Sequence, residues 1–302
     1  MKKGYFLVFL TAIISGFSIF INKYGVELFT NSYLFTFLKN VFVSVFLLSL
    51  FFLFKDWKKL KFLTKRDWVF LVLIGLIGGS IPFLLFFKGL SLTSAAKGSF
   101  LHKTMFIYCA ILAALFLKEK IDKKFLFAAL ILLFANAILL KKIPSEFNKG
   151  DLLVFLATIF WAIENTISKY LLKNLEGREV ALARMFFGSI FILLYLAFTN
   201  QISPILTLNL KQIGWVSITG ILLFGYVITW YSGLKHIPLH QATAILLLGS
   251  PITTFLNLIS GTKISQIEII SGSLIIFGIL IIFGKKFLEI ILKLKNLIYV
   301  RP

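Results

Sequence analysis

Long apolar segments alternate with short polar segments along almost the whole chain. Each apolar segment holds about 16 to 23 residues, enough for one α-helix to cross a bilayer. The predicted spans are Gly4–Asn22, Tyr33–Phe54, Trp68–Phe87, Ala95–Leu117, Phe125–Leu140, Leu152–Ser168, Val180–Phe198, Ile213–Tyr231, Ala242–Ser260 and Ile267–Phe283. The pattern therefore predicts an all-α integral membrane protein with ten transmembrane helices, a multi-pass protein of the cell membrane.

The composition agrees with a protein whose surface faces lipid. Apolar residues make up 59% of the chain and aromatic residues 16%, and the mean hydropathy is +0.95. A soluble domain of this size holds roughly half apolar residues, and it could not bury a larger share. The lipid bilayer is therefore the predicted surrounding of this chain.

The positive charge of the chain lies between the apolar segments. The formal net charge is +20, which in a soluble protein would suggest nucleic-acid binding. If the N-terminus is cytoplasmic, most of the 32 Lys and Arg residues fall in cytoplasmic segments. This bias is the positive-inside rule, so the charge predicts that both termini are cytoplasmic, and nucleic acid is not a predicted partner.

The second half of the sequence repeats short stretches of the first half. Leu-Val-Phe-Leu at positions 7–10 recurs at 153–156, and Lys-Tyr at 23–24 recurs at 169–170. Matches that keep their order at a nearly constant offset indicate duplication. Because each repeat has five spans, an odd number, the second repeat enters the membrane inverted, which is a transporter architecture.

The predicted organisation is a first five-helix repeat at 1–142, a second at 149–284 and a basic tail at 285–302. In the tail, apolar residues are mixed with lysines, as in an interfacial amphipathic helix or a plain basic anchor.

Two short motifs stand out beside the two five-span repeats. The turn Leu117-Lys118-Glu119-Lys120-Ile121 has an acidic residue followed by a basic one, and Gly249-Ser250-Pro251 places a proline inside the ninth span. With these features the sequence resembles the drug/metabolite transporter superfamily, in particular its EamA-type branch, which has a similar acidic-then-basic signature and a similar mid-helix proline. The chain departs from the family pattern in two places, where Thr104 replaces a frequent proline and Thr262 replaces an acidic residue.

The resemblance implies a secondary carrier with a substrate cavity between the repeats. It implies lining mainly by the third, fourth, eighth and ninth spans, with help from the first and sixth. It also implies transport, with export as the expected direction, of amino acids or similar small polar metabolites. A homodimer is left open.

Few charged residues lie inside the predicted spans. A charge at the bilayer centre costs about 2.5–3.5 kcal/mol, so such a group usually faces the bundle interior and has a partner. The fourth span holds Lys97, His102 and Lys103, and the sixth holds Glu164. Helix depth allows an ion pair between Lys103 and Glu164, either as a substrate site or as a structural pair. Lys39 and Arg184 lie nearer the membrane faces, which favours snorkelling to the headgroups.

Neutral polar and aromatic residues complete the predicted substrate-binding set. Asn165 and Gln241 offer hydrogen bonds, although helix contacts explain each of them equally well. Tyr226 and Trp230 are candidates for an aromatic cavity wall, or for interfacial anchors and core packing. The predicted site is Lys97, His102, Lys103, Glu164, Asn165, Tyr226, Trp230 and Gln241.

The sequence lacks the motifs of the other functional classes that a membrane protein could have. The sequence has no His-Glu-x-x-His helix, no Gly-x-Ser-x-Gly nucleophile and no Walker A loop. Its single cysteine, Cys109, has no metal-ligand spacing around it. An enzyme, a metal, a cofactor and direct ATP hydrolysis are therefore not predicted. The hypotheses that remain are a transporter of amino acids or other small polar metabolites, a transporter of an anionic metabolite such as a sugar phosphate or nucleotide sugar, and a non-transporting membrane scaffold.

Overall fold

All regular secondary structure of the described residues is helical. The computed structural model describes residues 2–140 and 146–299. Its helices are α1 (Lys2–Val26), α2 (Ser32–Leu53), α3 (Lys65–Gly79), α4 (Ile81–Leu90), α5 (Ala95–Lys103), α6 (Met105–Phe116), α7 (Lys123–Ala137), α8 (Lys149–Leu171), α9 (Gly177–Phe198), α10 (Leu210–Leu234), α11 (Leu239–Leu246), α12 (Gly249–Ile259) and α13 (Gln266–Tyr299), with short 3-10 helices at η1 (Asp56–Phe62), η2 (Ile138–Leu140) and η3 (Ser203–Thr207). Within this part of the chain, ten helical stretches are long and apolar enough to cross a membrane, which confirms the ten predicted spans.

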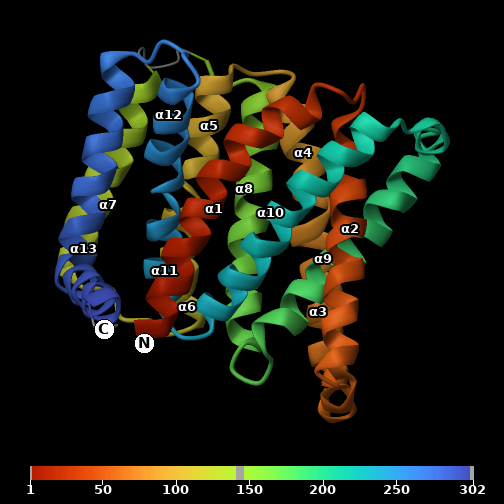
Figure 1. Ribbon diagram of the computed structural model, residues 1–302, viewed down its shortest axis with the longest axis horizontal. Coiled ribbons are helices and arrows are strands. Elements are labelled where there is room, and N and C mark those ends of the chain that lie inside the picture. The colour runs from red at the N-terminus through yellow and green to blue at the C-terminus, as the bar shows by residue number, and fades with distance from the viewer. Residues whose placement is uncertain (1, 141–145, 300–302) are drawn as a thin grey trace.

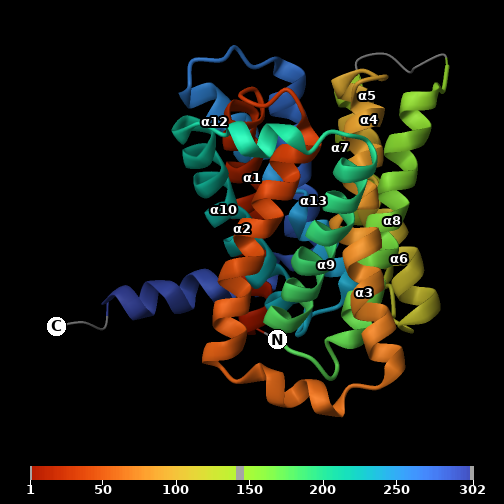
Figure 2. The same cartoon turned by 90° about the vertical axis from the view of Figure 1, so that its right-hand side faces the viewer.

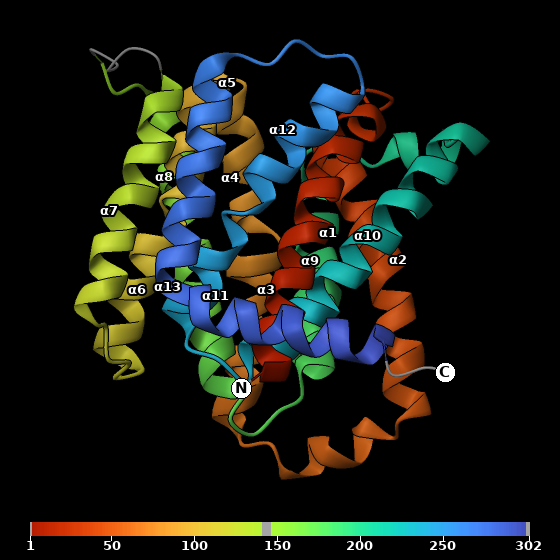
Figure 3. The same ribbon diagram turned by 60° about the vertical axis from the view of Figure 1, so that its left-hand side comes forward.

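The two ends of the chain lie on the same side of the bundle (Figures 1 and 3). We call this the N-terminal side, because α1 begins there. α8, the first helix of the second half, begins on the opposite side (Figure 2), so α1 and α8 run in opposite directions. The backbone of α13 continues through most of the predicted basic tail to Tyr299, whereas the tail's side chains lie outside the described residues.

Three of the ten spans are interrupted near their middle. The third divides at Ser80 into α3 and α4, and Pro82 in the first turn of α4 lacks the N–H that would continue the ladder. The ninth divides at Leu247 and Leu248, the two residues directly before the Gly-Ser-Pro segment noted in the sequence. The fourth divides at Thr104, whose hydroxyl donates to the Leu101 carbonyl at 2.6 Å. That last break was not predicted, because Thr104 takes the place of the expected proline.

Several helices extend further than their apolar segments. α8 begins at Lys149 instead of Leu152, because Asn148 and Asp151 form a capping box in which each side chain accepts a hydrogen bond from the other's backbone N–H. A hydropathy pattern omits such polar first turns. The predicted boundaries are therefore too short at this helix, while the number and order of the spans are correct.

The two halves of the chain interlock. α1 packs along α10, α3 crosses α9, α4 packs on α8, and α7 packs on α13. The largest helix contacts therefore join a span of the first half to a span of the second half. The outer surface is apolar: on α7, Phe127, Leu130 and Phe134 are each at least 60% exposed. Such a surface suits a protein that lies in lipid.

Candidate functional site

A central cavity of about 330 Å³ lies between the two halves. Its lining comes from α1, α2, α4, α5, α6, α8, α9, α10, α11 and α12, and therefore from every span except the fifth and the tenth. Asn22 near the end of α1 and Phe87 near the end of α4 place it toward the side opposite the N-terminal side. The helices implied by the family resemblance all contribute, and the second and seventh spans join them.

The charged residues that line this cavity are all basic. They are Lys39 on α2, Lys103 on α5 and Arg184 on α9, and no Asp or Glu lines it in the described part of the chain. Lys39 Nζ donates to Asn22 Oδ1 at 2.8 Å and lies 4.5 Å from the centroid of the Phe35 ring. Lys103 has no hydrogen bond or ion pair with any residue that the structure describes. The cavity is therefore positively charged.

The positions of Lys39 and Arg184 show that one prediction from the sequence was wrong. Their depth suggested snorkelling to lipid headgroups, but both side chains point into the bundle and line the cavity. Arg184 is only 8% exposed. Depth along a helix can be counted from the sequence, whereas the direction of a side chain around the helix depends on which neighbours pack there.

Glu164 forms its ion pair with Arg184. Its Oε2 lies 3.7 Å from Arg184 Nη1, and its Oε1 accepts hydrogen bonds from Tyr231 at 2.7 Å and from Ser168 at 2.6 Å. Arg184 also donates to the Tyr231 hydroxyl at 3.0 Å and to the Gly78 carbonyl at 3.2 Å. Arg184 lines the cavity, and Glu164 and Tyr231 contact Arg184 on its buried side; we call these three residues the floor of the cavity. Glu164 and Tyr231 are fully buried and do not line the cavity.

The floor leaves Lys103 without the partner that the sequence suggested. A Lys103–Glu164 pair was one prediction, but the described residues contain no contact between these two side chains. Glu164 lies against Gly78 of α3, and α3 crosses α9, which carries Arg184. Lys103 and Glu164 lie at similar depths on their helices, but similar depth was not sufficient to predict an ion pair. The Glu164 carboxylate faces α3 and α9 instead.

The remaining predicted site residues fall in three places. His102, Asn165 and Tyr226 line the cavity beside Lys103. Trp230 lies behind it and donates to Asn165 Oδ1 at 3.0 Å. Lys97 and Gln241 lie away from it, since Lys97 pairs with Asp151 at 3.1 Å and Gln241 accepts from the Tyr5 hydroxyl at 2.5 Å.

Part of the lining was not anticipated from the sequence. Phe83, Phe86 and Phe87 of α4 line the cavity together with His102 and Trp161, and we call these five residues the aromatic wall. Among the 35 phenylalanines of the chain, nothing in the local sequence distinguishes a ring that faces the cavity from one that faces lipid. The local feature of the sequence that comes closest to indicating these rings is Pro82, in the first turn of α4 at the break in the third span.

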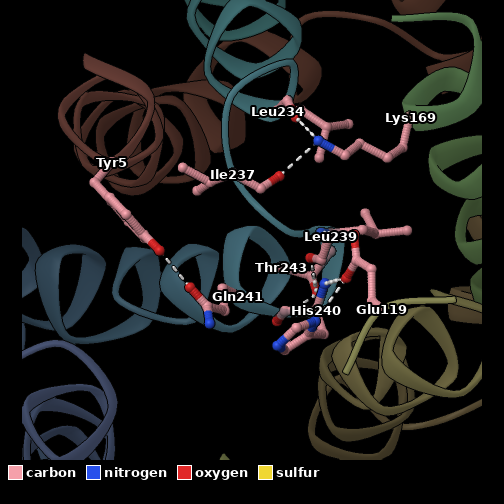
Figure 4. Close-up of polar contacts among 9 residues, drawn as sticks. All are labelled: Tyr5, Glu119, Lys169, Leu234, Ile237, Leu239, His240, Gln241 and Thr243. Carbon is pink, nitrogen blue, oxygen red and sulfur yellow. Dashed lines mark hydrogen bonds and ion pairs between the residues drawn. The ribbon is translucent and has the colours of Figure 1, made fainter. Parts of the chain in front are cut away.

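The N-terminal side of the bundle is closed by polar contacts around the start of α11 (Figure 4). Glu119, in the turn after α6, accepts hydrogen bonds from the backbone N–H of Leu239 at 2.7 Å and of His240 at 3.3 Å. His240 Nδ1 lies 2.6 Å from the same carboxylate. Lys169 donates to the carbonyls of Leu234 at 2.6 Å and Ile237 at 2.8 Å. We call the contacts of Glu119 with Leu239 and His240 the Glu119 clamp.

The charge of Glu119 suits its place at a helix N-terminus. Burial by itself would raise the pKa of this carboxyl, but hydrogen bonds from His240 and Leu239 outweigh it and hold the pKa below the ordinary value of 4.5. A carboxylate also interacts favourably with the positive end of the helix dipole. A lowered pKa contributes stability that is present above pH 4.5 and is lost as the pH falls through the lowered value. The clamp is therefore charged at neutral pH.

Glu119→Gln is expected to open the N-terminal side more often. Replacing charge-assisted hydrogen bonds by neutral ones weakens the clamp by an amount that corresponds to roughly a five-fold change in the opening equilibrium. Cys109 on α6 is fully buried and is the single thiol of the chain, so its maleimide labelling rate at constant pH reports this opening.

Glu268→Gln is the matched control for this labelling. Glu268 also accepts a hydrogen bond from a backbone N–H, that of Ser265 at 2.7 Å, but on the opposite side of the bundle. Equal labelling rates in the two variants would show that the Glu119 clamp does not hold the N-terminal side closed.

Comparison with known proteins agrees with this architecture. The sequence profile of the EamA-like transporter family matches residues 2–141 and 148–284. The chain belongs to the EamA-like transporter family. This EamA-like protein is therefore a multi-pass membrane transporter, and its membership points to transport without catalysis.

Individual relatives are distant but cover most of this EamA-like chain. The uncharacterized transporter YyaM of Bacillus subtilis is 24% identical over 73% of this chain and 74% of its own. The riboflavin transporter ImpX of Fusobacterium nucleatum is 27% identical over 79% of this chain and 84% of its own. A solved crystal structure superposes with a TM-score of 0.72 at 17% identity, covering 91% of this chain and 94% of that one, and it supports the fold alone.

Proposed function

We propose that this protein is a secondary transporter that carries a small organic anion through its central cavity. The observation that supports the proposal is the basic lining, with Lys39 and Lys103 in a cavity that no Asp or Glu lines among the described residues. Ammonium groups at membrane depth are costly, at about 2.5–3.5 kcal/mol each on insertion scales. An anionic substrate would supply the missing opposite charge.

An amino acid is the second candidate, and the site favours it less. The carboxylate of a zwitterion suits Lys103, but its ammonium group needs an acceptor such as a carboxylate. The buried carboxylate of Glu164 does not line the cavity, and it already pairs with Arg184 and accepts hydrogen bonds from Tyr231 and Ser168. The lysines therefore support an anion over a zwitterion. The name of the Fusobacterium relative supports a polar organic metabolite in general.

We infer that residues 1–142 and 149–284 are two inverted repeats. The two separate matches to the family profile, the opposite directions of α1 and α8 and the interlocking contacts between the halves support this inference. Most Lys and Arg residues of the connecting segments belong to the N-terminal side, so we place this side and both termini in the cytoplasm and the protein in the cell membrane. The cavity is lined by one chain, so the proposal requires no second copy.

Export is the proposed direction of transport. No Walker A loop is present in the sequence, so the proposed energy source is a gradient or the membrane potential. An inside-negative potential drives an anion outward by about 2.3 kcal/mol per charge and 100 mV. Anion export therefore needs no coupled ion. In the structure the Glu119 clamp closes the proposed cytoplasmic side, as expected for a state that faces outward.

The test of the proposed function is ligand binding and flux with purified protein. Thermal unfolding in detergent is followed with a panel of organic phosphates, carboxylates, amino acids and nucleosides, because a specific ligand raises the melting temperature. Uptake of the stabilising compounds is then measured in reconstituted vesicles. Lys103→Ala removes the unpartnered ammonium and is expected to weaken anion binding by about ten-fold or more. Lys88→Ala, at an exposed lysine at the end of α4, is the matched control.

Four results would contradict the proposal. Anions that fail to stabilise a folded protein would exclude an anionic cargo, and stabilisation by amino acids alone would favour the second candidate. Binding that is equally strong in wild type and Lys103→Ala would remove the basic lining from the site. Binding without any flux across vesicles would favour the scaffold hypothesis.

A further inference from the structure

We infer that the transported anion carries a planar ring, which packs on the aromatic wall while its anionic group binds the lysines. This inference rests on the proposed function and specifies its substrate class. It depends on the arrangement of the five rings that line one side of the cavity beside Lys103.

The aromatic wall is a connected cluster of rings. The His102 ring centroid lies 5.0 Å from that of Trp161 and 5.2 Å from that of Phe86. Phe86 and Trp161 are 5.5 Å apart, and Phe83 and Trp161 are 5.2 Å apart. All these separations lie in the range of favourable aromatic pairs. The four pairs are T-shaped or tilted, so the cluster presents both ring faces and ring edges, either of which can pack on a ligand ring.

The aromatic wall adjoins the positive charge. His102 and Lys103 are consecutive residues of α5, and both line the cavity. On α2, Lys39 lies at a similar depth, because each lysine is about seven or eight residues from the start of its helix on the opposite side of the bundle. A ligand with a ring on the wall would therefore have its anionic group within reach of an ammonium.

The wall is held in place before any ligand binds. Trp161 is 6% exposed, and its indole N–H donates to the Gly78 carbonyl at 3.1 Å, which fixes the ring plane. Phe86 and His102 contact this ring and are partly exposed. A pre-ordered surface loses little conformational entropy when a ligand binds. Binding at the wall therefore needs little reordering of the protein, and a rigid ring, which has few rotatable bonds to fix, would lose the least conformational entropy there.

The size and the charge of the cavity further restrict the class of ligand that fits. A volume of about 330 Å³ is at the lower end of the range for small-molecule sites, which is about 300–1,000 Å³. An aromatic wall can also bind an organic cation. Here Lys39, Lys103 and Arg184 would repel a cation. The combination points to a compact aromatic carboxylate or phosphate.

The test compares ligands that differ only in aromaticity. Phenyl phosphate and cyclohexyl phosphate have the same charge and nearly the same size, as do benzoate and cyclohexanecarboxylate. Dissociation constants are measured on the purified wild-type protein and on Phe86→Leu. We expect the aromatic member of each pair to bind roughly two- to ten-fold more tightly to wild type, and this preference to disappear in Phe86→Leu.

The control and the outcomes separate this inference from the proposed function. Phe127→Leu changes a phenylalanine that is 60% exposed on the outside of α7, and it should keep the preference. Equal binding of aromatic and saturated anions, still dependent on Lys103, would overturn the ring inference alone. If neither member of either pair binds folded wild-type protein while another organic anion of the panel does, the ring inference alone is overturned. If no anion of the panel binds, both proposals are overturned. Because the ligand comparison is made on wild type, it stands even if Phe86→Leu is unstable.

Discussion

Arg184→Met is expected to lower the free energy of unfolding by about 3–5 kcal/mol, because it leaves the Glu164 carboxylate buried without its cation. Glu164 is fully buried and Arg184 is 8% exposed, so the pair is shielded from bulk water and the lone carboxylate would be poorly solvated. The substitution also removes the donors to Tyr231 and to the Gly78 carbonyl. The floor of the cavity would lose the contacts that join α9 to α3, α8 and α10.

A double-mutant cycle measures this effect. Thermal or denaturant unfolding in one detergent is compared for wild type, Arg184→Met, Glu164→Leu and the double variant. Replacing both members by apolar residues is often close to neutral, so the double variant should be more stable than Arg184→Met. Arg66→Met, at an exposed arginine that stacks on Phe70, is the control and should cost less than about 1 kcal/mol.

The cycle would also show whether the ion pair is energetically important. If the destabilisation of the double variant equals the sum of those of the two single variants, the two residues do not stabilise each other. The destabilisation would then come from lost packing of the arginine side chain.

Gly79→Val is expected to prevent folding, because α3 and α9 cross at this position in backbone contact. A Cβ atom at Gly79 would lie 2.3 Å from the Arg184 carbonyl oxygen and 2.9 Å from Gly188 Cα. Both are backbone atoms of α9, so no side chain can rotate away to make room. Gly79→Ala should already cost about 1–3 kcal/mol, and the branched valine more.

The measurement is the yield of monodisperse protein after detergent extraction, followed by thermal unfolding of the alanine variant. Gly214→Ala is the matched control, since Gly214 lies in α10 with no atom within 4 Å of an added Cβ. There the loss of glycine flexibility should be neutral or stabilising by up to about 1 kcal/mol. Equal stability of Gly79→Ala and Gly214→Ala would show that the helices separate at little cost.

The broken helices show where sequence reasoning was sufficient and where it was not. Pro82 and Pro251 lack a backbone donor wherever they occur, so residue type alone accounts for the interruptions in the third and ninth spans. Residue type does not account for the break at Thr104, because threonine is compatible with an unbroken helix. There the hydroxyl bonds the Leu101 carbonyl in a three-residue turn.

The candidate site shows the same difference at the level of side chains. Lys103, His102, Asn165 and Tyr226 were identified because polar or aromatic groups at membrane depth stand out in an apolar sequence, and all four line the cavity. Lys39 stood out equally, but its short distance from the membrane face suggested that its side chain points to the lipid headgroups, whereas it points into the cavity. The rings of α4 could not be singled out at all among 35 phenylalanines.

The sequence by itself determined the membrane environment, the number and order of the ten helices and the set of intramembrane charges. Each of these depends on local hydropathy, which is a property of consecutive residues. Only the tertiary structure decided that Arg184 is the partner of Glu164, that Lys103 remains unpartnered and that five rings share one wall. Those relations depend on how each helix is rotated about its axis, and the contacts between distant segments determine that rotation.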